Sequence, residues 1–383
     1  MEKIKVMTVF GTRPEAIKMA PLVKVLEARE EIESIVCITA QHRQMLDQVM
    51  NIFDIKADYD LDIMQSGQTL SDITARVMKG IEETIKESKP DIVLVHGDTT
   101  TTFAGALGAF YCQTKIGHVE AGLRTYDKYS PFPEEMNRCL TTQLSDLYFA
   151  PTKNNEANLL KENVDKDKIY ITGNTVIDAM KTTVKDDYEF EDETLKTLDF
   201  ENKRVILVTA HRRENLGEPL KNICTAILNV INANPDTEAV YPVHLNPLVR
   251  ETVFEILGNH PRIHLIDPLD VTELHNLMNR CYLVMTDSGG LQEEAPSLGK
   301  PVLVLRNETE RPEAVAQGTV KLAGVDRSVI EEMANLLLTD KAAYDEMSKA
   351  VNPYGDGLAS ERIADAILYA FGKSEKKPNH FTY

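Results

Sequence analysis

The stretch YLVMTDSGGLQEEAPSLGKPVLVL spans residues 282–305 and contains the repeating unit of the predicted fold. Its apolar beginning, 282–285, and its apolar end, 301–305, both have the composition of buried strands. Between them lie a turn with the adjacent glycines Gly289 and Gly290 and a short segment of helical composition. Adjacent glycines at a strand-to-helix turn indicate that something comes close to the backbone. The stretch therefore predicts a βαβ unit with a binding site at its first turn.

The same alternation of apolar runs and helix-like segments continues from one end of the chain to the other. Most of the apolar runs are almost unbroken, which is typical of parallel strands covered by helices on both faces. The predicted strands are KVMTVF, SIVCITA, DIVLVHG, IGHVEA, LYFA and IYITG in the first half, and VILVTA, AVYPV, IHLID, LVMTD and PVLVL in the second. This pattern predicts an α/β protein with doubly wound sheets.

A polar and acidic segment at 178–203 interrupts the alternation and has no strand signal. We therefore expect two Rossmann-like doubly wound domains with an interdomain cleft. The N-terminal domain would comprise residues 1–177 and the returning C-terminal helix, 358–383, while 178–357 would form the second domain. We expect the final residues, 372–383, to be frayed.

The composition argues against several classes of partner. The 383-residue chain has a formal net charge of −18, whereas a nucleic-acid partner requires a basic surface. The chain has no long apolar run for a membrane span, and its N-terminus lacks the layout of a signal peptide. Its five cysteines are scattered and lack a C-x-x-C pair. These features predict a cytoplasmic protein without a zinc site.

Polar residues gather where the predicted strands end. In open α/β sheets, ligands bind outside the carboxyl ends of the strands, so we expect these segments to face one binding cleft. They are GTRPEAIK (11–18), AQHRQ (40–44), HGDTTTT (96–102), HVEAGLR (118–124), TAHRREN (209–215), PVHLNP (242–247), TDSGG (286–290) and RNETERPEA (306–314).

The turn at Ser288, Gly289 and Gly290 is a candidate phosphate site. A helix N-terminus offers unpaired N–H groups and a partial positive charge, and glycine leaves the backbone accessible. Glu294 lies one turn further along, where a carboxylate can hold ribose hydroxyls. The alternatives are a tightly packed N-capped turn and, at Glu294, a solvated helix charge.

Basic side chains at several strand ends supply the local positive charge that a diphosphate needs in an acidic protein. Each one alone is consistent with an ordinary surface charge. They are Arg13, Lys18, His211, Arg212, Arg213, Arg306 and Arg311.

Three acidic residues are candidates for proton transfer. Asp98 and Glu120 follow strand ends, and Glu134 lies in a predicted long loop with two prolines. Carboxylates clustered in a cleft repel one another and lose solvent, so we expect some of their pKa values to be raised. Raised values suit proton transfer near neutral pH. Helix capping or surface solvation is the alternative for each acid.

Motifs of several other sites are missing from the sequence. There is no G-x-G-x-x-G fingerprint for NAD, no P-loop, no H-E-x-x-H and no G-x-S-x-G. We therefore expect neither a bound cofactor nor a metal.

A series of long motifs resembles the non-hydrolysing UDP-N-acetylglucosamine 2-epimerases of bacteria and archaea. The resemblance implies two Rossmann-like domains of the glycosyltransferase-B type, usually in a homodimer. It implies an isomerase that interconverts UDP-N-acetylglucosamine and UDP-N-acetylmannosamine, whose product supplies cell-surface polysaccharide synthesis. The motifs follow one another over nearly the whole chain: FGTRPEAIKMAPL, QHRQML, HGDTTT, GHVEAGLRT, PFPEEMNR, TGNT, TAHRREN, TDSGGLQEEAPSLGKP and ERPEA.

The resemblance also implies a mechanism without metal or NAD. UDP is eliminated to leave a 2-acetamidoglucal, and it adds back while carbon 2 is protonated on the opposite face. The implied acid–base residues are Asp98, Glu120 and Glu134, and His211 with Arg13 stabilises the departing UDP. The implied UDP contacts are Arg13, His211, Ser288, Gly289, Gly290, Glu294 and Arg311, with Lys18 and Arg138 in supporting positions.

Bacterial members of this family resemble one another in an allosteric site for UDP-N-acetylglucosamine. Gly67 stands where many relatives have arginine, and the loss of a bidentate anion contact predicts weaker allosteric binding. Leu274 stands where relatives often have phenylalanine, which predicts looser packing of the uracil. The matching allosteric positions here are Gln41, Gln44, Gln68, Glu134, Arg212 and His244.

Three other functions fit the same fold. A UDP-sugar-dependent glycosyltransferase would use the same nucleotide site but needs an acceptor and fewer carboxylates. A hydrolysing 2-epimerase would release free N-acetylmannosamine and UDP. A non-catalytic UDP-sugar-binding protein would have no use for the acids Asp98, Glu120 and Glu134.

Overall fold

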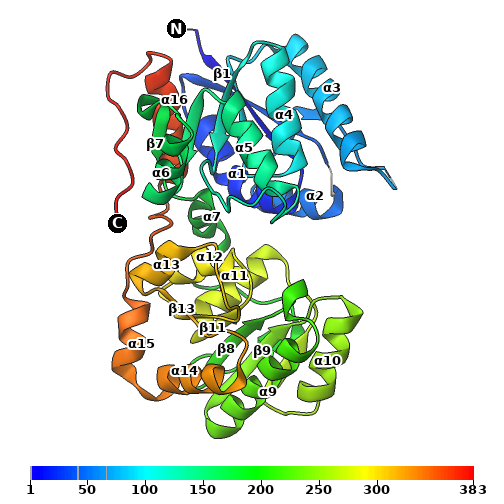
Figure 1. The fold of residues 1–383 in the computed structure, drawn as a ribbon, viewed down its shortest axis with the longest axis vertical. Coiled ribbons are helices and arrows are strands. Elements are labelled where there is room, and N and C mark those ends of the chain that lie inside the picture. Colours follow the sequence, from blue (N-terminus) through cyan, green and yellow to red (C-terminus); the bar gives the residue numbers. More distant parts are fainter. Residues whose placement is uncertain (1, 41–42, 66) are drawn as a thin grey trace. The chain divides into compact units, whose positions relative to one another are not determined.

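The computed structural model describes residues 2–40, 43–65 and 67–383, with the side chains of residues 44 and 45 left aside. The chain divides into two compact units (Figure 1). The first unit runs to Thr182 and includes Tyr354–Thr382, and the second comprises Thr183–Pro353 with Tyr383.

The divisions fall after Thr182 and after Pro353, rather than after residues 177 and 357 as the sequence indicated. Helix α7 (Thr175–Thr183) continues through the expected first boundary. At the second boundary, the backbone N–H of Asn174 donates to the carbonyl of Tyr354 at 2.6 Å, which fastens the returning segment to the first unit.

The described residues of the first unit form a parallel sheet in the order β3-β2-β1-β4-β5-β6-β7. Its strands are β1 (Ile4–Phe10), β2 (Ile32–Ile38), β3 (Tyr59–Asp60), β4 (Ile92–His96), β5 (Lys115–Val119), β6 (Leu147–Ala150) and β7 (Ile169–Ile171). Its other helices are α1 (Arg13–Glu27), α2 (Arg43–Ile52), α3 (Leu70–Ser88), α4 (Thr100–Tyr111), α5 (Glu134–Leu144), α6 (Lys153–Lys161), the 3-10 helix η1 (Lys166–Lys168) and α16 (Ala359–Ala370).

The second unit contains a parallel sheet in the order β10-β9-β8-β11-β12-β13. Its strands are β8 (Arg204–Thr209), β9 (Thr237–Pro242), β10 (Ile263–Ile266), β11 (Leu283–Thr286), β12 (Val302–Val304) and β13 (Val320–Leu322). Its helices are α8 (Glu193–Thr197), η2 (Arg213–Asn215), α9 (Glu218–Ala233), α10 (Pro247–Leu257), α11 (Val271–Arg280), α12 (Leu291–Ser297), α13 (Pro312–Gln317), α14 (Arg327–Thr339) and α15 (Lys341–Ser348). The predicted doubly wound α/β class is confirmed.

The strand order reverses in each sheet at a point where two turns lie side by side. In the first unit β1 pairs with β4, so the turn at 11–13 is adjacent to the turn at 97–99. In the second unit β8 pairs with β11, with Thr209 opposite Thr286. Ligands of open α/β sheets bind at such switch points. Each unit therefore presents a candidate site there.

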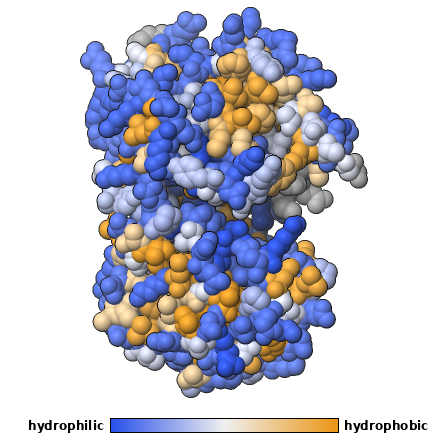
Figure 2. Space-filling view, in the orientation of Figure 1, coloured by the Kyte–Doolittle hydropathy of each residue, from blue (hydrophilic) through white to orange (hydrophobic). Residues whose placement is uncertain are grey.

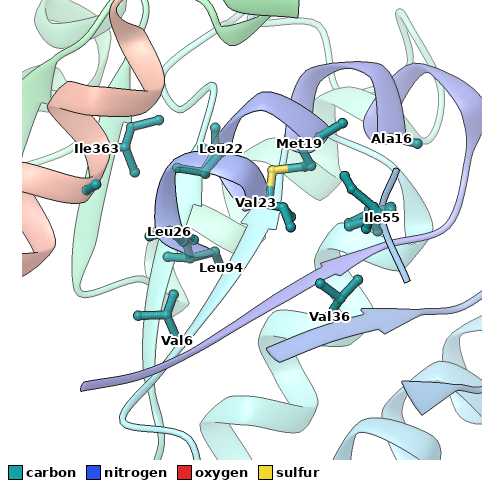
Figure 3. Close-up of a cluster of buried hydrophobic side chains, with 14 of the residues drawn as sticks. Val6, Ala16, Met19, Leu22, Val23, Leu26, Val36, Ile55, Leu94 and Ile363 are labelled. Carbon is teal, nitrogen blue, oxygen red and sulfur yellow. The ribbon is translucent and has the colours of Figure 1, made fainter. Parts of the chain in front are cut away.

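The C-terminal helix α16 belongs to the core of the first unit, as the sequence indicated. It packs against α1, and its Ile363 lies in one buried cluster with Leu22 and Leu26 of α1 and with Leu94 of β4 (Figure 3). Residues of the two ends of the chain therefore close the same core.

Replacing Ile363 by alanine is expected to lower the free energy of unfolding of the first unit by about 2–5 kcal/mol. The side chain is fully buried, so its loss removes apolar contacts and leaves a cavity. Tyr369→Ala, at the partly exposed end of the same helix, is the control and should cost about 1 kcal/mol or less. Urea unfolding of both variants checks this, and equal losses would contradict the packing of α16.

The structure corrects the expectation of a frayed tail and adds two short strands that were not predicted. The tail is not frayed at Phe381, whose buried side chain lies below the guanidinium of Arg362 and whose N–H donates to the carbonyl of Ile171 at 2.7 Å. The edge strands β3 and β13 were not predicted, because β3 has only the two residues YD and β13 reads VKL, with a lysine in the middle of the run. None of the helices in the described ranges is long and apolar enough to span a membrane.

Candidate active site

Glu120 follows β5 and lies at the centre of a polar cluster in the first unit. Its backbone has a φ of +63°, which is rare for a residue with a side chain. Its carboxylate forms an ion pair with Lys18 of α1 and accepts a hydrogen bond from Asn174 Nδ2 at 3.0 Å. His96 Nε2 at the end of β4 lies 3.5 Å from the same oxygen. Three segments that are distant in sequence thus hold this carboxylate.

The pKa of Glu120 differs from the expectation for clustered carboxylates. Burial raises the pKa, but the charge and hydrogen bond of Lys18, together with the nearby His96, outweigh burial and hold it well below its ordinary value. The prediction of a raised pKa is therefore wrong for Glu120. Its carboxylate is ionised at neutral pH and can accept a proton, but the same neighbours make it a weaker base than a free glutamate.

Arg138 of α5 joins two acidic residues of the first unit. Its Nε and NH2 donate to Asp98 Oδ2 at 3.0 and 2.6 Å, and its NH1 donates to Glu135 Oε2 at 2.9 Å. Asn137 Nδ2 donates to the carbonyl of Asp98 at 2.9 Å. Helix α5 therefore fixes both the backbone and the side chain of Asp98 beside the end of β4.

Glu134 is the first residue of α5, and it does not lie in a loop as expected. The preceding prolines end the irregular segment, and the helix begins directly after Pro133. Its Oε2 is buried and, among the residues that the structure describes, has no hydrogen-bond partner. Arg13 begins α1 and is exposed.

Glu15 is a site residue that the motif search missed. It is buried in the first turn of α1, and its Oε2 accepts from the backbone N–H groups of Gly11 and Thr12 at 3.1 and 2.8 Å. Its Oε1 accepts from the hydroxyl of Thr99 at 2.6 Å. Glu15 thus ties the turn that carries Arg13 to the turn after β4. The T-x-x-E capping box was the signal in the sequence.

Replacing His118 by glutamine is expected to remove a pH dependence of stability. Burial lowers the pKa of His118 to about 4, although its Nε2 bonds to the carbonyl of Gly97 at 2.7 Å. The unfolded chain, with a pKa of about 6.5, therefore takes up a proton at moderately acidic pH that the folded unit does not.

The free energy of unfolding should consequently fall by about 3 kcal/mol from this group as the pH drops from about 6.5 to about 4. Gln keeps a donor near the position of Nε2 but does not titrate. Urea unfolding between about pH 7 and about pH 4.5 should show a flatter profile for His118→Gln. Equal slopes in both proteins would contradict a neutral buried His118.

The glycine turn of the second unit lies against an arginine. A Cβ at Gly289 would come within 3.1 Å of Arg311 Cζ, so glycine allows the guanidinium to pack against the turn. Arg311 Nε donates to Glu293 Oε1 at 2.8 Å, and its NH1 lies 3.0 Å from Glu310 Oε1. These carboxylates orient the guanidinium beside Ser288, Gly289 and Gly290.

Glu294 lies on the first turn of α12, on the side of the glycines. Its Oε1 would lie 3.1 Å from a Cβ at Gly290, and its Oε2 lies 3.4 Å from His275 Nε2. The other ring nitrogen of His275 bonds to the hydroxyl of Thr183 at 2.7 Å. The carboxylate is therefore held next to the candidate phosphate turn.

His211 follows β8 on the same edge of the sheet. Its ring stacks on that of His244, with centroids 5.0 Å apart and planes inclined by 6°. Its backbone N–H donates to the buried carboxylate of Asp287 at 2.8 Å. The switch point of the second unit thus brings His211 close to the turn that contains Asp287 and Ser288.

The residues of the expected allosteric set are only partly described. Gln41 and the side chain of Gln44 lie outside the described residues. Gln68 precedes α3, and its Oε1 accepts from Arg76 NH1 at 3.2 Å. Gly67 has a φ of +73°, which favours glycine, so an arginine there would be strained in this backbone conformation.

Comparison with known proteins decides the family. A model of the family described as UDP-N-acetylglucosamine 2-epimerase matches residues 24–368. The chain belongs to this family. A UDP-N-acetylglucosamine 2-epimerase of Bacillus subtilis (strain 168) is 57% identical over 383 residues, which cover 100% of both chains.

Solved structures of the UDP-N-acetylglucosamine 2-epimerase family agree with this assignment. The enzyme from Neisseria meningitidis, bound to UDP-GlcNAc, is 50% identical, with a TM-score of 0.86 over 95% of this chain and 100% of that chain. The enzyme from Methanocaldococcus jannaschii, in complex with UDP-GlcNAc and UDP, is 33% identical, with a TM-score of 0.77 over 96% and 100% of the two chains.

Family membership confirms the resemblance found in the motifs, while the roles of individual residues remain predictions. Four residues beside the predicted ones were not singled out from the sequence, although each contacts a predicted residue or its turn: Glu15, His96, Asn174 and Asp287. All four lie inside quoted motifs, and in the motifs of Glu15, His96 and Asp287 the neighbouring residues drew the interpretation.

Proposed function

We propose that this epimerase-family protein interconverts UDP-N-acetylglucosamine and UDP-N-acetylmannosamine by inversion at carbon 2 of the sugar. The proposal rests on family membership together with one observation: the ionised Glu120 is held among Lys18, Asn174 and His96 after β5, beside the turn at 97–99. The protein would act in the cytoplasm, and its product would supply cell-surface polysaccharide synthesis.

The proposed reaction is an elimination followed by an addition. A base removes the proton from carbon 2, the bond between carbon 1 and the diphosphate oxygen breaks, and its electron pair leaves with UDP. In the return step the diphosphate oxygen attacks carbon 1, and an acid protonates carbon 2 on the other face. These steps need an acceptor, a donor and positive groups at the leaving diphosphate.

The first unit supplies the proposed acid–base groups. Glu120 is the proposed proton acceptor because it is ionised and lies among Lys18, Asn174 and His96. Asp98 is likewise paired with a cation, Arg138. Glu134, the third proposed acid–base residue, has a buried oxygen without a hydrogen-bond partner among the described residues.

The second unit supplies the proposed UDP contacts. The diphosphate would bind at Ser288, Gly289 and Gly290, beside the oriented guanidinium of Arg311. The ribose would bind Glu294, and His211 would face the departing diphosphate together with Arg13 of the first unit. Backbone N–H groups and a guanidinium provide local donors, which explains how a chain with a net charge of −18 can bind an anion.

A glycosyltransferase and a hydrolysing 2-epimerase remain the competing functions. Incubation with UDP-N-acetylglucosamine alone, followed by chromatography of the nucleotides, separates them. We expect UDP-N-acetylmannosamine with little free UDP. Stoichiometric UDP and free sugar would indicate hydrolysis, and turnover only after addition of an acceptor would indicate transfer.

The resemblance also implies an allosteric site and a homodimer, which we retain as proposals. The allosteric ligand would be UDP-N-acetylglucosamine, bound by Gln68, Glu134, Arg212, His244 and the glutamines at 41 and 44. For the dimer, neighbouring helices α4 and α5 of the first unit expose the large apolar side chains Phe110, Tyr111, Met136 and Leu140. Figure 2 shows hydrophobic residues gathered over these helices.

Replacing Phe110 by glutamate is expected to shift the mass in solution from dimer toward monomer. The side chain is 53% exposed beside Tyr111, which is 62% exposed, and such patches are common at protein interfaces. Light scattering after gel filtration measures the mass. Leu336→Glu, on an exposed face of α14 in the other unit, is the control and should leave the mass unchanged. An unchanged dimer in Phe110→Glu would exclude this face.

A further inference from the structure

Only one of the two carboxylate oxygens of Asp287 accepts hydrogen bonds from the described residues. The residue is fully buried at the end of β11. Its Oδ2 accepts from the backbone N–H groups of His211 and Arg212 at 2.8 Å each, and from Asn215 Nδ2 at 3.0 Å. Its Oδ1 is buried and has no hydrogen-bond partner within the described part of the chain. A buried acceptor without a donor is costly, so this oxygen calls for an explanation.

His211 is placed to provide the missing donor. Its Nδ1 lies 3.8 Å from Asp287 Oδ1, which is beyond a hydrogen bond. The backbone N–H of His211 is bonded to Oδ2 of the same carboxylate, which keeps the ring beside Oδ1. A hydrogen bond between Nδ1 and Oδ1 requires a proton on Nδ1 and a closer approach of the two atoms.

The surroundings of His211, taken together, oppose a positive charge on its ring. Three charged or titratable side chains face it: Asp287 after β11, His244 after β9 and Arg212 before η2. Burial lowers the pKa of His211, Asp287 raises it, and His244 and Arg212 lower it, so the net direction is downward. His244 Nδ1 accepts from the N–H of Asn246 at 3.0 Å, which leaves Nε2 as the protonated nitrogen of neutral His244. Without a ligand, His211 is therefore neutral at neutral pH.

We propose that Asp287 is a positioning residue that loads His211 with a proton when the diphosphate of UDP binds. A bound diphosphate adds a second anion on the open side of the ring. The imidazolium then donates from Nδ1 to Asp287 Oδ1 and from Nε2 to a diphosphate oxygen, and the proton comes from solvent. In the reaction, this charge stabilises the diphosphate as it leaves carbon 1. The inference rests on the proposed UDP site and adds its protonation.

The proposal predicts that UDP binding takes up protons. Titration calorimetry with UDP, repeated in buffers of different ionisation enthalpy at about pH 7.5, counts the protons bound per UDP. The wild-type chain should take up at least about half a proton more than His211→Asn, because two anions beside a histidine raise its pKa. The same subtraction removes the contribution of the phosphate of UDP, whose own pKa is about 6.

Asp287→Asn tests the positioning role. The amide can still accept the backbone N–H groups, but it has no charge to stabilise the imidazolium. Its proton uptake should fall to the level of His211→Asn, and the double variant should show no further change. Asp326→Asn, an exposed cap of α14, is the matched control and should behave as wild type.

The outcomes are distinguishable. Equal proton uptake by wild type and His211→Asn would overturn the proposal, and this comparison does not depend on Asp287→Asn folding. If a folded Asp287→Asn variant takes up as many protons as wild type, Asp287 only binds the backbone N–H groups and has no part in the protonation of His211. If wild-type protein fails to bind UDP at all, the proposed UDP site is wrong rather than its protonation.

Discussion

Replacing Glu120 by glutamine is expected to lower the turnover number of epimerisation by about a hundredfold to ten-thousandfold. Gln has nearly the same shape but cannot accept a proton from carbon 2. Affinity for UDP should change by about twofold or less, because the proposed UDP contacts lie mostly in the other unit. Steady-state kinetics and calorimetry with UDP measure the two effects separately.

The Glu120 prediction has a matched control in the same unit. Glu82 of α3 is a half-exposed acid that pairs with Lys86 at 2.6 Å, one turn along the helix. Glu82→Gln should retain wild-type kinetics, since an exposed pair of this kind contributes little to stability. Turnover by Glu120→Gln within about tenfold of wild type would remove Glu120 from the proton-transfer step.

Replacing Arg311 by alanine is expected to raise the Kd for UDP by about tenfold to a hundredfold. A hydrogen bond to a charged group contributes roughly 1.5–3 kcal/mol, and the guanidinium lies against the glycine turn proposed to hold the diphosphate. Arg311→Lys keeps the charge but loses the planar fork, so its Kd should lie between wild type and alanine. Calorimetric titration with UDP gives the three values.

Loss of Arg311 also removes ion pairs with Glu293 and Glu310, so folding must be measured separately. Burial raises the pKa of Glu310, but Arg311 and Arg306 lower it to about 2, and Arg306 remains in the variant. Arg327→Ala, which breaks an exposed pair with Glu331, is the control for a lost surface arginine. A folded Arg311→Ala protein with an unchanged Kd would place the diphosphate elsewhere.

The sequence was sufficient for the fold because each long strand is an almost unbroken apolar run between helical segments. The eleven runs quoted from the sequence correspond to strands of the two parallel sheets, whereas YD of β3 and VKL of β13 are not apolar runs. The domain boundary was harder to predict than the strands. Composition suggested a break after residue 177, but helix α7 continues through that position.

The sequence was less informative about the electrostatics of the site. It placed Glu120 correctly after a strand, but the pKa depends on Lys18, which lies 102 residues earlier in the chain. An argument from burial alone, without Lys18, predicts a raised pKa for Glu120, whereas the pKa is lowered. Asp287 lies within the quoted TDSGG motif, yet only the structure shows one carboxylate oxygen bonded to the His211 turn and the other without a donor.

The central claim is that the chain exchanges the proton on carbon 2 while it retains the nucleotide sugar. The most direct measurement incubates the protein with UDP-N-acetylglucosamine in deuterium oxide and follows the sugar by proton NMR. We predict UDP-N-acetylmannosamine that carries deuterium at carbon 2, with little free UDP. Product that retains its original hydrogen at carbon 2, or UDP released in step with free sugar, would contradict the account.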